Sequence, residues 1–96
     1  MLWAIWCRDV EGGGEVRSRV GRRHSDHLTN ASVHIVIAGP LIGDASDGSV
    51  GSLVVVEADN RAEVEEFVSQ DPFKVEGVWR SVEIAAFKMS RIDFRS

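Results

Sequence analysis

Continuous and alternating runs of apolar residues along the chain predict four β-strands. Three runs are almost entirely apolar and are bounded by polar, Gly- or Ser-containing stretches, which is typical of strands buried on both faces. They cover residues 2–8, 33–38 and 53–57. Residues 78–89 alternate instead between the two faces of a longer strand, with Arg80 and Val82 on one face and Trp79 and Glu83 on the other. We expect a loop over residues 43–52, and we expect the second strand to end at Gly39-Pro40, because proline cannot continue an interior ladder.

Residues 15–31 have apolar residues at helical spacing. Positions four apart form one stripe, because four steps of about 100° nearly close one turn. The stripe contains Val16, Val20, His24 and Leu28, with His27 and Ala31 beside it. The arginines of this segment, including Arg17, mostly fall on other faces. Gly21 weakens the helix by roughly 1 kcal/mol relative to alanine, so packing must hold it.

A second helical segment starts with a capping pattern. Asn60 can cap the helix, and Glu63 can reach back to it. The buried face then consists of Val64, Phe67 and Val68. The break that follows contains Asp71-Pro72, itself a typical helix start. Residues 91–96 form a polar tail with two expected anchors, Ile92 and Phe94.

The order strand, helix, strand, strand, helix, strand predicts a ferredoxin-like α+β fold, βαββαβ. In this fold a four-stranded antiparallel sheet carries both helices on one face. The first three strands are nevertheless apolar on both sides, so the second face also needs a cover. A second copy of the sheet is the simplest cover, and we therefore expect a homodimer with the sheets face to face.

Composition narrows the class of protein and its partners. The 96 residues include 11 Lys+Arg and 15 Asp+Glu, a net charge of −4, which argues against nucleic acid as the main partner. We expect residues 1–96 to form a single domain. No apolar run reaches the roughly 20 residues of a membrane span, and the apolar N-terminus lacks the basic region of a signal peptide. With one cysteine, Cys7, these features favour a cytoplasmic protein without membrane association.

Three segments, in this order, resemble the YCII-related (YciI-like) domain family. The first is Arg23-His24-Ser25-Asp26-His27-Leu28 and the second is Ala38-Gly39-Pro40-Leu41. The third is Asp71-Pro72-Phe73, with Gly77-Val78 and the closing residues 82–87. The resemblance covers nearly the whole chain. It implies a dimeric α+β barrel, in which two ferredoxin-like sheets surround a pocket.

The resemblance also implies a catalytic pair. Members of the family are often described as enzymes built around a histidine and an aspartate, which fall here on His24 and Asp71. A carboxylate beside an imidazole fixes its tautomer and leaves the other ring nitrogen to move a proton. We therefore expect His24 to act as general acid or base and Asp71 to orient it, within about 2.6–3.2 Å.

Substrate-binding residues are expected close to His24. Gly21 stands where an arginine is common in the family, so Arg22 or Arg23 is expected to bind an anionic substrate in its place. His27 stands where an aromatic residue is common, and we include it among the substrate-binding candidates. The expected ligand is an anionic or aromatic small molecule.

Each candidate also has a structural interpretation. A histidine on an apolar helix face is often a core residue bonded to a backbone carbonyl, and Asp71 could serve only as an N-cap. Both roles of Asp71 can coexist, because a carboxylate has two oxygens. The basic run from Arg17 to Arg23 is typical of a solvated helix face. Cys7 is expected to pack as a small buried apolar residue.

A metal site and a cofactor are not expected. His24 and His27 share a helix face, and His34 follows, but no acid or thiol completes a recognisable ligand pattern. No nucleotide or flavin motif is present, and acid/base chemistry needs no cofactor.

Two functions remain open from the sequence. The first is a small-molecule enzyme, an isomerase or a dehydrochlorinase-like lyase, that uses the His24–Asp71 pair. The second is a non-catalytic dimeric scaffold or ligand-binding module with a structural histidine.

Overall fold

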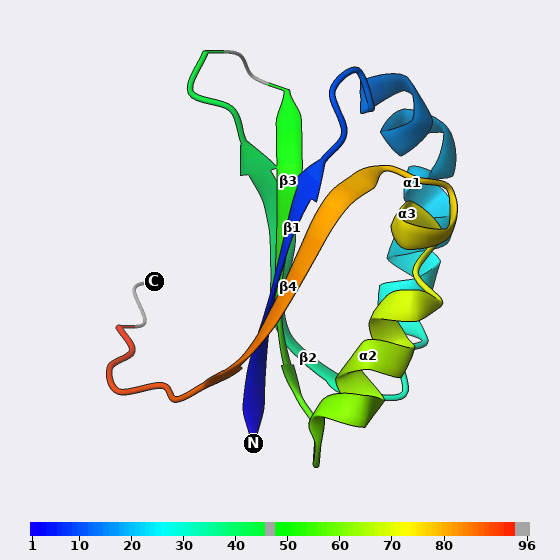
Figure 1. Cartoon of the computed structure of the whole chain (residues 1–96). Coiled ribbons are helices and arrows are strands. Elements are labelled where there is room, and N and C mark those ends of the chain that lie inside the picture. The colour runs from blue at the N-terminus through cyan, green and yellow to red at the C-terminus, as the bar shows by residue number, and fades with distance from the viewer. Residues whose placement is uncertain (46–47, 94–96) are drawn as a thin grey trace.

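A four-stranded antiparallel sheet carries the helices on one of its faces (Figure 1). The computed structural model describes residues 1–45 and 48–93. Its elements are β1 Leu2–Asp9, α1 Gly14–Thr29, β2 His34–Ile42, β3 Ser49–Glu57, α2 Arg61–Ser69, α3 Pro72–Val75 and β4 Trp79–Phe87. The strand order is β2-β3-β1-β4. The ferredoxin-like α+β fold is therefore confirmed, with the short α3 added between α2 and β4.

The second and third strands are longer than the sequence indicates. β2 runs through Pro40, at which we expected it to end. Pro40 pairs with Ser52, and β2 is an edge strand, where a proline can turn its missing N–H outward. β3 begins at Ser49, so the expected loop is shorter. Residues 46–47 of that loop lie outside the described residues.

The core lies between the sheet and the helices. β1 turns Trp3, Ile5 and Cys7 toward the helices, and these side chains are buried. The Trp3 Nε1 donates to the carbonyl oxygen of Ala58 at 3.2 Å, which satisfies the indole inside the core. α2 begins as expected, because the Asn60 side chain accepts a hydrogen bond from the Glu63 amide at 3.0 Å. No helix within residues 1–45 and 48–93 is long and apolar enough to cross a membrane.

A register shift in β4 reverses the side chains at its start. Arg8 pairs with Ser81, but the next residue, Asp9, pairs with Trp79, so Arg80 is the extra residue of a bulge. Simple alternation would place Trp79 on the same face as Glu83, away from the helices. The bulge instead buries Trp79, which is 7% exposed, on the helix side and leaves Arg80 exposed. The expected facing of Trp79 and Arg80 was therefore wrong.

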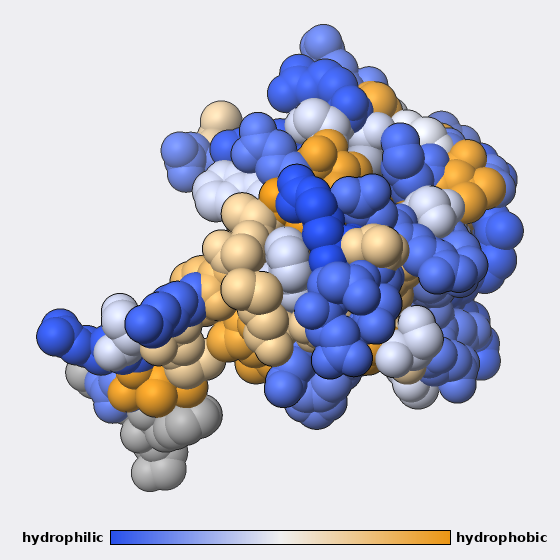
Figure 2. All heavy atoms as spheres, turned by 60° about the horizontal axis from the view of Figure 1, so that its bottom comes forward, coloured by the Kyte–Doolittle hydropathy of each residue, from blue (hydrophilic) through white to orange (hydrophobic). Residues whose placement is uncertain are grey.

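The other face of the sheet has no cover among the described residues, and it is apolar. Trp6 is 45% exposed, because it lies three residues after Trp3 on β1 and its side chain therefore points to the opposite face of the sheet. The residues that line a groove on this face include Trp6, Val36, Ile37, Leu53, Val55, Phe87 and Met89. The segment after β4 leaves the sheet on the side away from the helices (Figure 1), and apolar side chains gather where it departs (Figure 2). In that segment Ile92 is 55% exposed and lines the same groove, while Phe94 lies outside the described residues.

Candidate functional site

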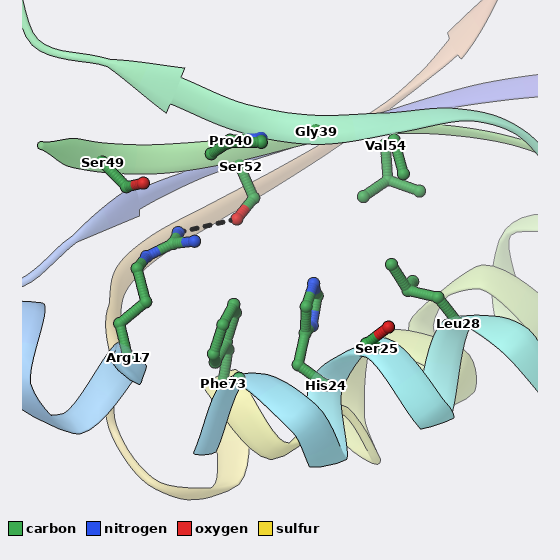
Figure 3. Close-up of a pocket in the computed structure, with 12 residues that line it drawn as sticks. Arg17, His24, Ser25, Leu28, Gly39, Pro40, Ser49, Ser52, Val54 and Phe73 are labelled. Carbon is green, nitrogen blue, oxygen red and sulfur yellow. Dashed lines mark hydrogen bonds between the residues drawn. The ribbon is translucent and has the colours of Figure 1, made fainter. Parts of the chain in front are cut away.

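A cavity of about 390 Å³ lies between α1 and the sheet, within the usual size range of small-molecule pockets (Figure 3). One wall comes from α1 and the opposite wall from β2 and β3. The lining residues on α1 are Arg17, Gly21, His24, Ser25 and Leu28. Those on the sheet are Ala38, Gly39, Pro40, Ser49, Ser52 and Val54, and Phe73 of α3 completes the lining.

His24 projects from α1 toward the sheet, into this cavity (Figure 3). Its ring stacks on Phe73, with the centroids 3.9 Å apart and the planes within 12°. Trp79 meets the His24 ring nearly at a right angle, with centroids 6.2 Å apart. The bulge in β4 is what brings Trp79 to this side of the sheet. The His24 ring is thus held by two aromatic side chains, and its side chain is only 15% exposed.

Asp71 is buried behind His24 and has two partners. The Nδ1 of His24 lies 2.8 Å from Oδ1 and 2.9 Å from Oδ2 of Asp71. The Oδ1 also accepts a hydrogen bond from the backbone amide of Phe73 at 2.9 Å. Asp71 is therefore the N-cap of α3, with Pro72 in the first turn. The capping contact and the histidine contact coexist in one side chain.

The partner of Nδ1 determines what the other nitrogen of His24 can do. An ionised carboxylate can only accept hydrogen bonds, so the Nδ1 of His24 carries the proton and donates to Asp71. In the neutral ring the Nε2 is then unprotonated and available to a ligand. Figure 3 shows a ring nitrogen at the tip of His24, on the side that faces the sheet. This arrangement can take a proton from a ligand in the cavity or return one to it.

Arg17 also lines the cavity, and the sequence analysis placed it on another face of the helix. It lies seven residues before His24, and seven steps of about 100° bring it within about 20° of the same direction. The helical periodicity could therefore have identified it. Its Nε and Nη2 donate to Asp9 at 2.8 and 3.1 Å. Nη2 also donates to the carbonyl oxygen of Gly51 at 2.8 Å and to Ser52 Oγ at 2.9 Å.

Gly51 is needed for this arrangement. A Cβ at Gly51 would overlap the carbonyl oxygen of Cys7 on the neighbouring strand β1. The absence of a side chain allows β3 to lie close to β1, where the Gly51 carbonyl receives the Arg17 guanidinium.

The three expected substrate-binding residues lie away from the cavity lining. Arg22 is exposed, and Arg23 is 3.7 Å from the carboxylate of Glu76 on the surface. The Nε2 of His27 lies 2.9 Å from the carbonyl oxygen of Phe67, and its ring stacks on the Phe67 ring at 4.7 Å. None of the three is among the cavity-lining residues in the described part of the chain.

Cys7 lies in the core beside the charged groups of this region. Burial, followed by the carboxylates of Asp71 and Asp9, raises the pKa of the Cys7 thiol from 9.0 to about 12. The thiol therefore stays protonated at neutral pH and is a poor nucleophile. Within residues 1–45 and 48–93, no group of three or more His, Cys, Asp or Glu side chains is placed to hold a metal ion.

Several solved structures resemble this chain. The 5-chloro-2-hydroxyhydroquinone dehydrochlorinase of Burkholderia phenoliruptrix AC1100, in complex with 2,5-dihydroxybenzoquinone, is 28% identical with a TM-score of 0.85. That match covers 92% of this chain and 94% of the other. A cofactor-independent oxygenase of Streptomyces nogalater is 14% identical with a TM-score of 0.55, over 95% of this chain and 93% of the other, and shows the fold alone. No curated protein matches the chain.

A match to a family model identifies the family of this chain, in agreement with its fold and its sequence motifs. The model of the YCII-related domain matches residues 1–88, which include all four strands and the His24, Asp71 and Phe73 cluster. The chain therefore belongs to the YCII-related domain family.

Proposed function

We propose that this protein is a small-molecule enzyme that uses His24 as general acid or base, with Asp71 as the residue that orients it. The observation that carries the proposal is the 2.8 Å contact between His24 Nδ1 and Asp71, made beside a cavity that His24 lines. Phe73 and Trp79 limit rotation of the ring, so Nε2 keeps one direction. A base that is held in one direction at the wall of a cavity is well placed to exchange a proton with a ligand bound there.

The proposed reaction class is elimination of HCl or a related isomerisation. Nε2 of His24 takes a proton from the substrate, and the electron pair of that bond forms a new double bond. In an elimination, chloride leaves with the electron pair of the C–Cl bond, so the net change is loss of HCl. The similarity to a dehydrochlorinase, with a TM-score of 0.85, supports this class. Such a reaction needs no external oxidant, and we propose that no cofactor takes part.

The test is chloride release from 5-chloro-2-hydroxyhydroquinone, the substrate named for the similar dehydrochlorinase. Purified protein should release chloride in proportion to enzyme concentration, and His24→Asn should abolish most of the release. If the wild-type protein and the variant give the same rate, His24 is not the catalytic group. A product isomeric with the substrate, formed without chloride, would assign the isomerase class instead.

The alternative is a ligand-binding or scaffold module in which His24 has a structural role. In that case the Asp71–His24 contact stabilises α3 against α1, and ligand binding produces no chemical change. Ligand binding without turnover, together with a large loss of stability in His24→Asn, would favour this alternative.

We further propose that two copies pair through the open faces of their sheets. The support is the apolar groove on that face, which includes Trp6, Val55 and Phe87. Burial of such a face is strongly favourable at about 25 cal/mol per Å² of apolar surface. Light scattering should give twice the chain mass, and Trp6→Glu should give the monomer mass. A monomeric wild-type protein would contradict the pairing.

The cellular location remains a prediction. A single cysteine, Cys7, buried and free, is compatible with the reducing cytoplasm that the sequence favours.

A further inference from the structure

Gly21 lies in the middle of α1 and contributes bare backbone to the wall of the cavity. It follows Arg17 by four residues and precedes His24 by three, so the three positions share one face of the helix. Figure 3 shows the side chains of Arg17 and His24 projecting from this face toward the sheet. A side chain at position 21 would therefore enter the same cavity.

Neither the backbone conformation nor the packing requires a glycine at this position. Gly12 has a φ of 74°, whereas the φ of Gly21 is not positive. A Cβ at Gly21 would meet no heavy atom of the described residues within 4 Å, apart from its chain neighbours and the backbone of its own helix. Glycine is nevertheless less favourable than alanine inside a helix, because its backbone loses more freedom on folding. The chain therefore gives up helix stability at a place where the cavity gains space.

The space beside Gly21 suits an apolar group of a ligand. The backbone N–H and C=O groups in the middle of a helix bond to one another, so position 21 offers a ligand no hydrogen bond. Much of the remaining lining is also apolar and includes Leu28, Ala38, Pro40 and Val54. A chlorine atom or a methyl group is close in size to the Cβ that Gly21 lacks. Such a substituent therefore matches both the room and the chemistry of this wall.

We propose that Gly21 is a specificity-determining residue, whose missing side chain admits a chlorine- or methyl-sized substituent on the ring of the ligand. The ligand class is a substituted single-ring phenol or quinone. Its reacting atoms lie at Nε2 of His24, and the substituent lies against the backbone of α1 at Gly21. This inference rests on the proposed function for the reaction and specifies the substrate class of the same site. The binding step can be tested without turnover.

The test compares two probes that differ only in their substituents. 2,5-Dihydroxybenzoquinone has hydrogen on its two remaining ring carbons, and its 3,6-dichloro derivative has chlorine there. Both probes are ionised at neutral pH, because their hydroxyl groups are vinylogous carboxylic acids. In calorimetric titrations the wild-type protein should bind the dichloro probe at least as tightly as the unsubstituted one. Gly21→Leu should weaken the dichloro probe at least about tenfold more than the unsubstituted probe, because the new side chain occupies the space of the chlorine.

Ser18→Leu is the matched control, because Ser18 lies on the same helix, is exposed and is outside the cavity lining. It adds the same side chain and should leave both affinities unchanged. If Gly21→Leu keeps the wild-type ratio of the two affinities, the inference is wrong. A wild-type protein that binds neither probe, or that binds the unsubstituted probe and rejects the dichloro probe, would also overturn it.

Three further measurements cover the remaining outcomes. If Gly21→Leu does not fold, Gly21→Ala provides a smaller step, which should weaken the dichloro probe several-fold and leave the unsubstituted probe unchanged. In the unmodified protein, the backbone amide signal of Gly21 should shift further with the dichloro probe than with the unsubstituted one; equal shifts would contradict the inference. His24→Asn should keep the wild-type ratio of the two affinities while it loses turnover. Retained turnover in that variant would reject the proposed function and leave the role of Gly21 in binding intact.

Discussion

Two neighbouring turns of α1 present a histidine in nearly the same way, and only one of them makes a candidate active site. His24 and His27 each stack on a phenylalanine, Phe73 and Phe67, with planes within 12° and 14°. Each also places one ring nitrogen 2.8–2.9 Å from an oxygen. For His24 this oxygen belongs to a carboxylate, and for His27 it belongs to the backbone carbonyl of Phe67.

The two histidines differ in the partner of the bonded ring nitrogen and in whether the residue lines the cavity. His24 belongs to the lining of the cavity, while His27 does not, in the described part of the chain. A carbonyl partner makes His27 a satisfied packing residue, the arrangement that the sequence analysis held open for His24. A carboxylate can also stabilise a positively charged ring, which a base must become when it takes a proton. Aromatic stacking and a hydrogen bond alone therefore do not identify a catalytic histidine.

The largest expected effect separates the two histidines directly. His24→Asn should lower chloride release from 5-chloro-2-hydroxyhydroquinone by about 10²–10⁴, the usual contribution of general acid/base catalysis. His27→Asn, the matched control, should keep the activity, because it changes a packing residue outside the cavity lining. Steady-state rates for the two purified variants check this. Equal losses of activity in both variants would contradict a catalytic role for His24 and a packing role for His27.

Asp71 should show the next largest effect, on stability as well as activity. Asp71→Ala removes the cap of α3 and the partner of His24, so the free energy of unfolding should fall by about 2–3 kcal/mol. Asp71→Asn retains an acceptor for the Phe73 amide and should cost less stability, but it should still lose activity. Urea denaturation and rate measurements on both variants separate the two roles. If Asp71→Asn keeps full activity, the carboxylate does not support the histidine.

The pKa of the Cys7 thiol reports how little water reaches the core near Asp71. The pKa of Cys7 is raised to about 12 in the folded protein from 9.0, so the unfolded chain releases this proton first. The stabilisation is complete below pH 9.0 and is lost as the pH rises toward about 12, at about 1.4 kcal/mol per pH unit. Measurements of the free energy of unfolding between these pH values give the slope, and Cys7→Ala should remove this pH dependence. Rapid alkylation of the native thiol at pH 8 would show that water reaches this part of the core.

The smallest expected effect concerns the helix between Arg17 and His24. A Cβ at Gly21 meets no atom within 4 Å, and its backbone is not in the left-handed region, so Gly21→Ala should stabilise the protein by up to about 1 kcal/mol. Gly12→Ala, at a φ of 74°, should do the opposite. Thermal denaturation compares them. A loss of stability in Gly21→Ala would mean that the helix needs this glycine for packing.

The sequence predicted the fold well, because the two longer helices show apolar residues at helical spacing and the strands are either apolar runs or alternate. It could not predict the facing of Trp79, because a bulge adds one residue and reverses the alternation. The predicted end of the second strand at Pro40 was wrong, because the local sequence does not reveal the strand order that leaves β2 at an edge of the sheet. Arg17 was overlooked because a run of arginines on a helix is usually solvated. Only the tertiary structure supplies Asp9 and the Gly51 carbonyl, which hold it inside.

Asp71 both caps α3 and contacts His24, and this double role affects how related sequences should be interpreted. A protein that lost its chemistry would still need a side-chain acceptor at position 71 to cap α3, so a capping residue followed by proline should persist in inactive descendants. Among the described residues, the hydrogen bond of the His24 side chain is made to Asp71 and not to a backbone group. When genomes are searched for active homologues, the residue at the position of His24 is the one to examine. The Asp-Pro pair indicates only that the chain folds.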